Sequence, residues 1–223
     1  MPQKWLLTRG AVCQASTTAI SQGMLEWNLV HVVSWAFLLR VQSEGIPLEW
    51  GCASDVLDLP QGRHSALVIL ETEIVLRLRA RKHRPRGSVM RRKCECKVMP
   101  GGCAFCTLRA YHLQHRPTPG QKLFAGSGSN FLKLFRQFLQ DAQVPGAAAF
   151  TLKAYRAGHA TVMAREGASW AALQSAGEWR GKSPLSYVDA TAIDDVAYLE
   201  NIVADSSEEE AVESFTTVIA HHY

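Results

Sequence analysis

The sequence predicts an α+β fold that is mostly helical and carries a small antiparallel β-sheet. Apolar residues recur at helical spacing in residues 24–39 and 131–142, and again in the stretch 152–176. Between the first two helices, three short segments read as strands, at residues 66–70, 73–79 and 88–92. A chain of 223 residues, with 47% hydrophobic and 20% charged residues, is long enough to bury a full core.

The start of the chain divides into a lead-in and a buried helix. Residues 1–23 show no clear hydrophobic period, so we expect them to be poorly ordered and the domain to span residues 24–203. The helix over 24–39 ends at Arg40, which it would present at its C-terminal end. A helix-terminal arginine is also commonly a structural charge.

Charge is distributed unevenly along the chain, although the net charge is only +4. Residues 77–97 hold ten lysines and arginines against one acid, whereas the chain after Lys182 holds nine acids and no lysine or arginine. A basic block indicates a polyanionic partner, and we expect residues 204–223 to form an acidic tail. The candidate DNA-contacting side chains are arginines of this block, namely Arg79, Arg81, Arg84, Arg86, Arg91 and Arg92.

Four of the six cysteines are bunched as a Cys-x-Cys pair and a Cys-x-x-Cys pair that six residues separate. Two thiol pairs at the ends of a short loop can converge on one tetrahedral zinc and close its coordination. Free buried thiols or a redox pair are the alternatives, and His112 is a spare candidate ligand. The sequence therefore favours a structural zinc loop over 94–106, with the ligands Cys94, Cys96, Cys103 and Cys106.

The middle of the chain combines a loop with an aromatic helix. Residues 113–130 are rich in proline, glycine and serine, which is loop composition. Asn130 is placed as an N-cap for the helix over 131–142, whose aromatic stripe we expect to be core. That helix ends before Pro145.

The stretch 152–187 carries side chains suited to phosphate chemistry. Gly167 and Gly177 are placed to end two successive helices. Arg156 offers a planar fork that matches a phosphate, and Lys153 adds a cation one turn earlier. Further donors follow on Trp179 and Tyr187. Together they suit a displacement at phosphorus in which a tyrosine is the nucleophile.

This stretch resembles the catalytic half of the tyrosine recombinases, the phage-integrase-like enzymes. Their pattern is His/Lys-x-x-Arg, a glycine eleven residues after that arginine, a His or Trp about 23 residues after it, and a tyrosine eight or nine residues further. Arg156, Gly167, Trp179 and Tyr187 fit that spacing. The segment Phe37-Leu-Leu-Arg-Val-Gln-Ser-Glu44 resembles the family's first arginine motif, with the Glu four residues after Arg40 where three is usual.

The resemblance implies a catalytic set and a mechanism. The family keeps a lysine on a β-hairpin, and Lys82 lies at the tip of the hairpin expected here, where it could instead grip phosphates. Two arginines would hold one DNA phosphate, the tyrosine would attack it, and the lysine would protonate the departing 5′ oxygen. The implied catalytic residues are Arg40, Lys82, Lys153, Arg156, Trp179 and Tyr187.

The function implied is site-specific recombination or integration through a 3′-phosphotyrosine intermediate, without a cofactor for catalysis. The implied partners are double-stranded DNA and other copies of the chain on that DNA, in an intracellular and nuclear setting; no apolar run reaches the length of a membrane span. Type IB topoisomerases use the same constellation. Family members carry a helical DNA clamp before the first arginine, whereas 39 residues precede Arg40. The alternative is therefore a decayed mobile-element fragment that binds DNA without cutting it.

Overall fold

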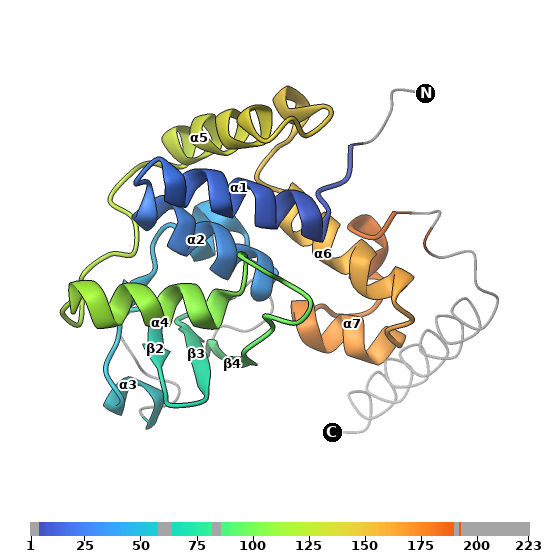
Figure 1. The fold of residues 1–223 in the computed structure, drawn as a ribbon. Coiled ribbons are helices and arrows are strands. Elements are labelled where there is room, and N and C mark those ends of the chain that lie inside the picture. Colours follow the sequence, from blue (N-terminus) through green and yellow to red (C-terminus); the bar gives the residue numbers. More distant parts are fainter. Residues whose placement is uncertain (1–4, 58–63, 82–85, 190–191, 193–223) are drawn as a thin grey trace, which may run out of the picture. The chain divides into compact units, whose positions relative to one another are not determined.

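The computed structural model describes residues 5–57, 64–81, 86–189 and 192. These residues form two compact units, Met1–His159 and Ala160–Tyr223, and the boundary falls within one helix. The described part contains seven α-helices and one four-stranded sheet, so the predicted α+β class is confirmed (Figure 1). None of its helices combines the length and apolar character that a membrane crossing requires.

The expectation of a poorly ordered lead-in is wrong over Arg9–Ser21, which forms helix α1. Thr8 caps the helix, because its hydroxyl accepts a hydrogen bond from the backbone N–H of Ala11 at 3.2 Å. Helix α1 packs on α2 (Leu25–Ala36) and α5 (Gly128–Asp141), as Figure 1 shows. Its buried face is built of small residues, so the sequence has no broad hydrophobic stripe to reveal it.

Helix α2 confirms the prediction for residues 24–39, although it ends earlier, at Ala36. Every residue from Trp27 to Ala36 is buried. A helix that is covered on all sides lies at the centre of a core. In the first unit, α1 and α4 (Ala104–His115) both pack on α2, and α4 also packs on the sheet. Because α2 is surrounded in this way, it fixes where the chain emerges toward Arg40.

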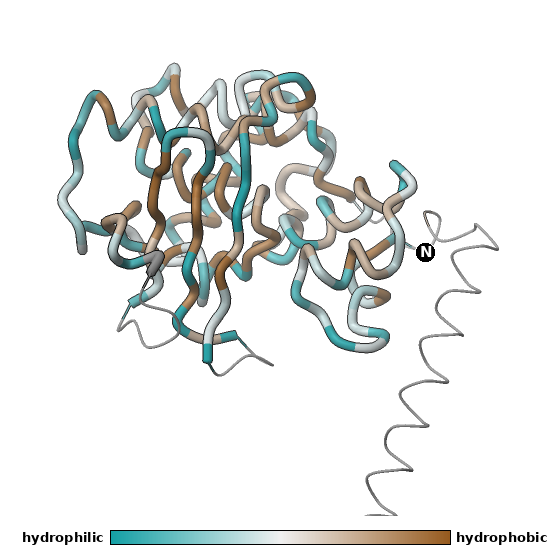
Figure 2. The backbone as a smooth tube through the Cα atoms, turned by 90° about the horizontal axis from the view of Figure 1, so that it is seen from below, coloured by the Kyte–Doolittle hydropathy of each residue, from teal (hydrophilic) through white to brown (hydrophobic). Residues whose placement is uncertain are grey.

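The sheet has the order β1-β2-β3-β4, from Glu49–Trp50, Ala66–Ile69, Glu73–Leu78 and Ser88–Lys93. The three predicted strands pair antiparallel as expected, whereas β1 adds a parallel edge. Hydrophobic colouring marks the middle of the sheet in Figure 2, in agreement with the burial of Leu67, Val75 and Leu76. Gly87 has φ +80°, and a Cβ there would lie 2.3 Å from the Leu78 carbonyl oxygen. Only glycine fits that turn.

Helices and turns after the sheet differ from the sequence-based expectation in two places. Helix α4 runs to His115, so the expected loop begins later than residue 113. Ser127, and not Asn130, caps α5: its hydroxyl accepts from the Asn130 N–H at 3.2 Å. The aromatic stripe of α5 is buried as predicted. The remaining short elements of the first unit are α3 (Ser54–Leu57) and a 3₁₀ turn, Ala147–Ala149.

The last described elements are α6 (Ala154–Arg165), α7 (Trp170–Gly177) and a 3₁₀ turn, Ser183–Ser186. Gly167 has φ +77°, as expected for a residue that ends α6. Helix α7 includes Gly177 and ends in a left-handed Glu178, so its predicted stop lies one residue later. The predicted acidic tail, residues 204–223, lies outside the described residues.

Candidate functional site

Arg40 lies in a tight loop between α2 and the sheet. After α2 the backbone turns at Leu38, which has φ +48°, and Arg40 then opens a single π turn, Val41–Gly45. The backbone N–H of Arg40 donates to Glu44 Oε2 at 2.8 Å, and its Nη1 donates to Glu44 Oε1 at 3.0 Å. A π turn holds one more residue than an α turn. It therefore brings an acid four residues after Arg40 back onto that arginine.

The side chain of Glu44 is 4% exposed, and arginines lie around its carboxylate. Arg81 donates to it twice, from Nε to Oε1 at 3.2 Å and from Nη2 to Oε2 at 3.1 Å. Burial alone would raise the pKa of Glu44. The hydrogen bond and charge of Arg81, the Arg40 N–H and the charge of Arg156 together outweigh burial and hold the pKa below its usual range.

Arg156 on α6 belongs to the same cluster. It is 3% exposed, and its charge acts on the Glu44 carboxylate. Lys153 is exposed at the start of α6. Three arginines from separate segments thus surround a single carboxylate in the first unit. Because one acid offsets one of those charges, the cluster carries an excess of positive charge suited to an anion.

A buried hydrogen-bond chain sets the position of α6. His31 Nε2 lies 3.0 Å from the carbonyl oxygen of Val12, and its Nδ1 lies 2.6 Å from Tyr155 Oη. A carbonyl oxygen only accepts, so Nε2 carries the proton of a neutral ring and Nδ1 accepts from Tyr155. Burial lowers the pKa of His31 to about 4, which keeps the ring neutral. Burial also raises the pKa of Tyr155, so its hydroxyl remains a donor next to Arg156.

The predicted DNA-contacting arginines fall into two groups. Arg81 is buried on Glu44, and Arg92 donates from Nε to the Ala36 carbonyl oxygen at 2.8 Å. Burial lowers the pKa of Arg92, and the charge of Arg81 adds to this effect while Glu95 opposes it. Both side chains are therefore engaged with the protein.

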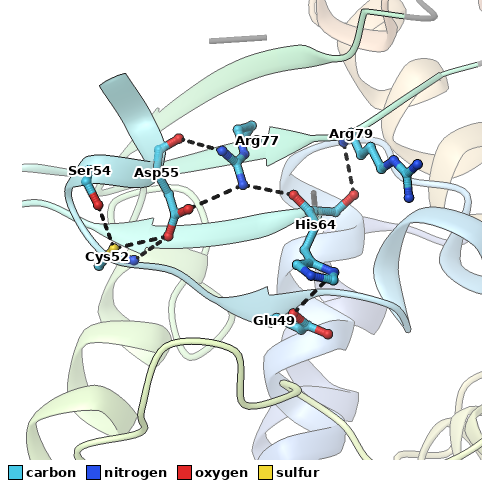
Figure 3. Close-up of polar contacts among 8 residues, drawn as sticks. Glu49, Cys52, Ser54, Asp55, His64, Arg77 and Arg79 are labelled. Atoms are coloured by element: carbon cyan, nitrogen blue, oxygen red, sulfur yellow. Dashed lines mark hydrogen bonds and ion pairs between the residues drawn. The ribbon is translucent and has the colours of Figure 1, made fainter. Parts of the chain in front are cut away.

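Three of these arginines are exposed: Arg79, Arg86 and Arg91. Arg91 pairs with Glu73 across the sheet. The backbone N–H of Arg79 donates to the Ser65 hydroxyl at 3.1 Å, and Figure 3 shows its guanidinium directed away from the neighbouring polar network. Arg84 and Lys82 lie outside the described residues.

The network in Figure 3 lies at the end of β3, next to Arg79. Arg77 donates to the Asp55 carbonyl oxygen at 3.1 Å and to the His64 carbonyl oxygen at 3.0 Å. The Cys52 N–H donates to Asp55 Oδ2 at 2.8 Å, which holds the start of α3. The side chain of Arg77 is 7% exposed. These bonds hold the guanidinium of the buried Arg77 and tie α3 to the strands, which is a structural role.

Trp179 and Tyr187 lie in the second unit. Their rings are stacked, with centroids 5.2 Å apart and planes 24° apart. Trp179 is buried and Tyr187 is half-buried. Gly177 makes room for the indole, since a Cβ there would lie 2.3 Å from it. Beyond the tyrosine, Val188 is buried and the Asp189 N–H donates to Thr161 Oγ1 at 2.9 Å. The chain is therefore anchored directly after Tyr187.

The four bunched cysteines converge as predicted. Cys94 and Cys96 follow β4, and Cys103 and Cys106 lie at the start of α4. Their sulfur atoms all lie within 4.8 Å of one another, with Cys96 and Cys106 3.3 Å apart, Cys94 and Cys106 3.6 Å apart, and Cys94 and Cys103 4.0 Å apart. The Glu95 N–H points at Cys103 Sγ, 3.3 Å away. The four sulfurs form a cluster of metal-binding dimensions.

Comparison of the chain with protein-family models, with curated proteins and with solved structures finds no match. The case for a function therefore comes from the chain's own geometry. Reasoning from the sequence found Arg40, Arg156 and the cysteines. It missed that Glu44 bonds to Arg40 and feels the charge of Arg156, and that Arg81 is buried against Glu44. It also missed the role of His31. For His31, the available signal was a histidine within the apolar helical pattern of residues 24–39.

Proposed function

We propose that this chain cleaves and rejoins strands of double-stranded DNA through a covalent phosphotyrosine intermediate on Tyr187. The observation that carries the proposal is that Arg40 bonds to the Glu44 carboxylate while the charge of the buried Arg156 acts on the same group. Two guanidinium groups held together in this way can grip the non-bridging oxygens of one phosphodiester. The recombinase-like spacing of the chain adds Trp179 and Tyr187 to that pair.

Each proposed role follows from the chemistry of the side chain. Arg40 and Arg156 hold the phosphate and stabilise charge that grows on it in the transition state, with Lys153 and the Trp179 indole as further donors. Tyr187 attacks the phosphorus as its hydroxyl loses a proton. The bond between phosphorus and the 5′ oxygen breaks, and that oxygen gains a proton from a general acid, the role proposed for Lys82.

The intermediate conserves the energy of the phosphodiester. A 5′ hydroxyl can attack the phosphotyrosine, reform the DNA backbone and release Tyr187. When the attacking hydroxyl belongs to another duplex, the outcome is recombination or integration, which requires more than one copy of the chain on DNA. The exposed Arg79, Arg86 and Arg91 supply phosphate contacts that do not depend on sequence.

The test is a nicked suicide duplex that loses the short 5′ fragment on cleavage, so that religation is impossible. The native chain should form a covalent protein–DNA adduct, which denaturing electrophoresis detects. Tyr187→Phe should abolish the adduct and retain DNA binding, whereas Tyr111→Phe, on a different helix, should form it normally. Binding without any adduct would leave a DNA-binding fragment, and plasmid relaxation without exchange between duplexes would favour a topoisomerase.

We further propose that the four cysteines hold one structural zinc ion. A tetrahedral site with Zn–S bonds of about 2.3 Å places its sulfurs about 3.8 Å apart. Three of the sulfur–sulfur distances, 3.3 to 4.0 Å, bracket that value, and all of them lie within 4.8 Å. Four thiolates leave no open coordination position, so the ion would fasten the end of β4 to the start of α4 and take no part in cleavage.

A further inference from the structure

Two arginines of the β3–β4 hairpin contact the loop that carries Arg40. Arg81 follows β3 and reaches the loop at two places, the Glu44 carboxylate and the carbonyl oxygen of Leu38, which lies 3.5 Å from its Nη2. Arg92 on β4 reaches the start of the same loop through the Ala36 carbonyl oxygen. Its guanidinium also lies over the Phe37 ring, 5.1 Å from the centroid.

These contacts fall where the loop backbone is least stable by itself. Leu38 has φ +48°, a conformation that residues other than glycine adopt only when their surroundings impose it. Helix α2 ends at Ala36, so the Ala36 carbonyl lies in its terminal turn and the Leu38 carbonyl lies in the loop beyond it; neither has a partner within the helix, and both need donors. The two hairpin arginines supply donors that satisfy them.

Burial separates Arg81 from a DNA-contacting role. The side chain of Arg81 is 4% exposed, whereas that of Arg40 is 35% exposed. Arg81 occupies both oxygens of Glu44, and Arg40 adds one bond from Nη1. The remaining face of the Arg40 guanidinium is therefore turned to solvent and available to a ligand.

We propose that Arg81 is a positioning residue: it shares Glu44 with Arg40 and so fixes the direction in which Arg40 presents its guanidinium. This inference rests on the proposed function insofar as the ligand of Arg40 is a DNA phosphate. Without Arg81, Glu44 retains its negative charge and attracts Arg40 more strongly. The Arg40 guanidinium then turns inward, and the loop loses its donor at Leu38.

The activity test compares Arg81→Met with Arg79→Met, a matched loss of one arginine from an exposed site. Arg81→Met should slow adduct formation at saturating duplex about 100-fold, as expected when a phosphate-holding group is misplaced by about 1 Å. It should leave the salt dependence of DNA binding unchanged. Arg79→Met removes a proposed phosphate contact, so it should weaken duplex binding and reduce the slope of log affinity against log salt by about 1.

Arg81→Lys keeps the charge and removes the fork, so it should fold like the native chain and still cleave slowly. This variant separates positioning from a loss of stability. If Arg81→Met and Arg79→Met alter the salt slope equally and cleavage equally, Arg81 is a DNA contact and the proposal is wrong.

A second readout requires no cleavage, so it judges the positioning role even if the native chain forms no adduct. In chain labelled with [15N]arginine, Arg40→Lys identifies the Nε–Hε signal of Arg40. That signal should shift or broaden in Arg81→Met and in Glu44→Gln, and should stay in place in Arg79→Met. An Arg40 signal that is unchanged in Arg81→Met would overturn the inference, whereas a missing adduct with a displaced signal would count against the proposed function alone.

Discussion

Acidification should destabilise the first unit through His31 well before its carboxylates are protonated. His31 is buried and held neutral between Val12 and Tyr155, with its pKa lowered by burial to about 4. In the unfolded chain the imidazole has its ordinary pKa of about 6.5. Below that pH the unfolded state binds a proton that the folded state excludes. This contribution to stability is therefore complete well above pH 6.5 and is lost progressively as the pH falls from about 6.5 to about 4.

The size of the effect follows from the pKa difference. At about 1.4 kcal/mol per pH unit, the interval from 6.5 to about 4 corresponds to about 3 kcal/mol of unfolding free energy. About 2 kcal/mol of this is lost between pH 7 and pH 5. Glu44 acts in a different window: its pKa is lowered, so its contribution is lost only as the pH falls below the usual range of a carboxyl group.

The assay is urea unfolding at pH 7, 6 and 5, followed by tryptophan fluorescence, to which the buried Trp27 contributes; its ring stacks on His31 at 4.6 Å. The matched control is His31→Gln, whose amide offers one donor and one acceptor and does not titrate. The native chain should lose about 2 kcal/mol more than His31→Gln over this range. Equal losses in the two chains would refute the buried neutral imidazole.

Two further predictions concern the metal cluster and the packing of α6. Protein purified without chelator should contain about one zinc per chain by elemental analysis. Cys106→Ser should lose the metal and melt at a lower temperature, whereas Cys52→Ser, outside the cluster, should retain the metal. A metal-free native chain would contradict the site. Gly158→Ala should destabilise by about 1–3 kcal/mol in urea unfolding despite the better helix propensity of alanine, because its Cβ would lie 2.2 Å from the Leu7 carbonyl oxygen. Gly10→Ala, in α1, meets nothing closer than 3.9 Å and should not destabilise; equal behaviour of the two variants would refute the close contact.

Elements with a strong local signal could be predicted from the sequence. The apolar period of α2 and the aromatic stripe of α5 survive in the structure, and the β3 segment forms the expected strand, although it is buried throughout from Ile74 to Leu78. Helix α1 could not be found in this way, because its buried face consists of alanine, valine and serine and its burial depends on α2 and α5. The two-residue β1 carries too little pattern to indicate its parallel pairing.

The candidate site shows the same division. Residue spacing led to Arg40, to Arg156 and to the four cysteines, because each of them belongs to a short local motif or to a motif with fixed spacing along the chain. The roles of Glu44 and Arg81 depend on contacts between segments far apart in the chain, and no local pattern distinguishes a buried arginine from an exposed one in a basic strand. Both Arg81 and Arg92 therefore read as surface charges in the sequence, whereas in the structure Arg81 is buried and Arg92 is half-buried.

The measurement that tests the central claim most directly is the identity of the residue that carries DNA after cleavage. The adduct from the suicide duplex is digested with nuclease and protease, and mass spectrometry locates the remaining nucleotide. The chain has five tyrosines, and the account predicts modification of Tyr187 alone, with no modified peptide from Tyr187→Phe. A nucleotide attached to another tyrosine, or to a serine or cysteine, would contradict it.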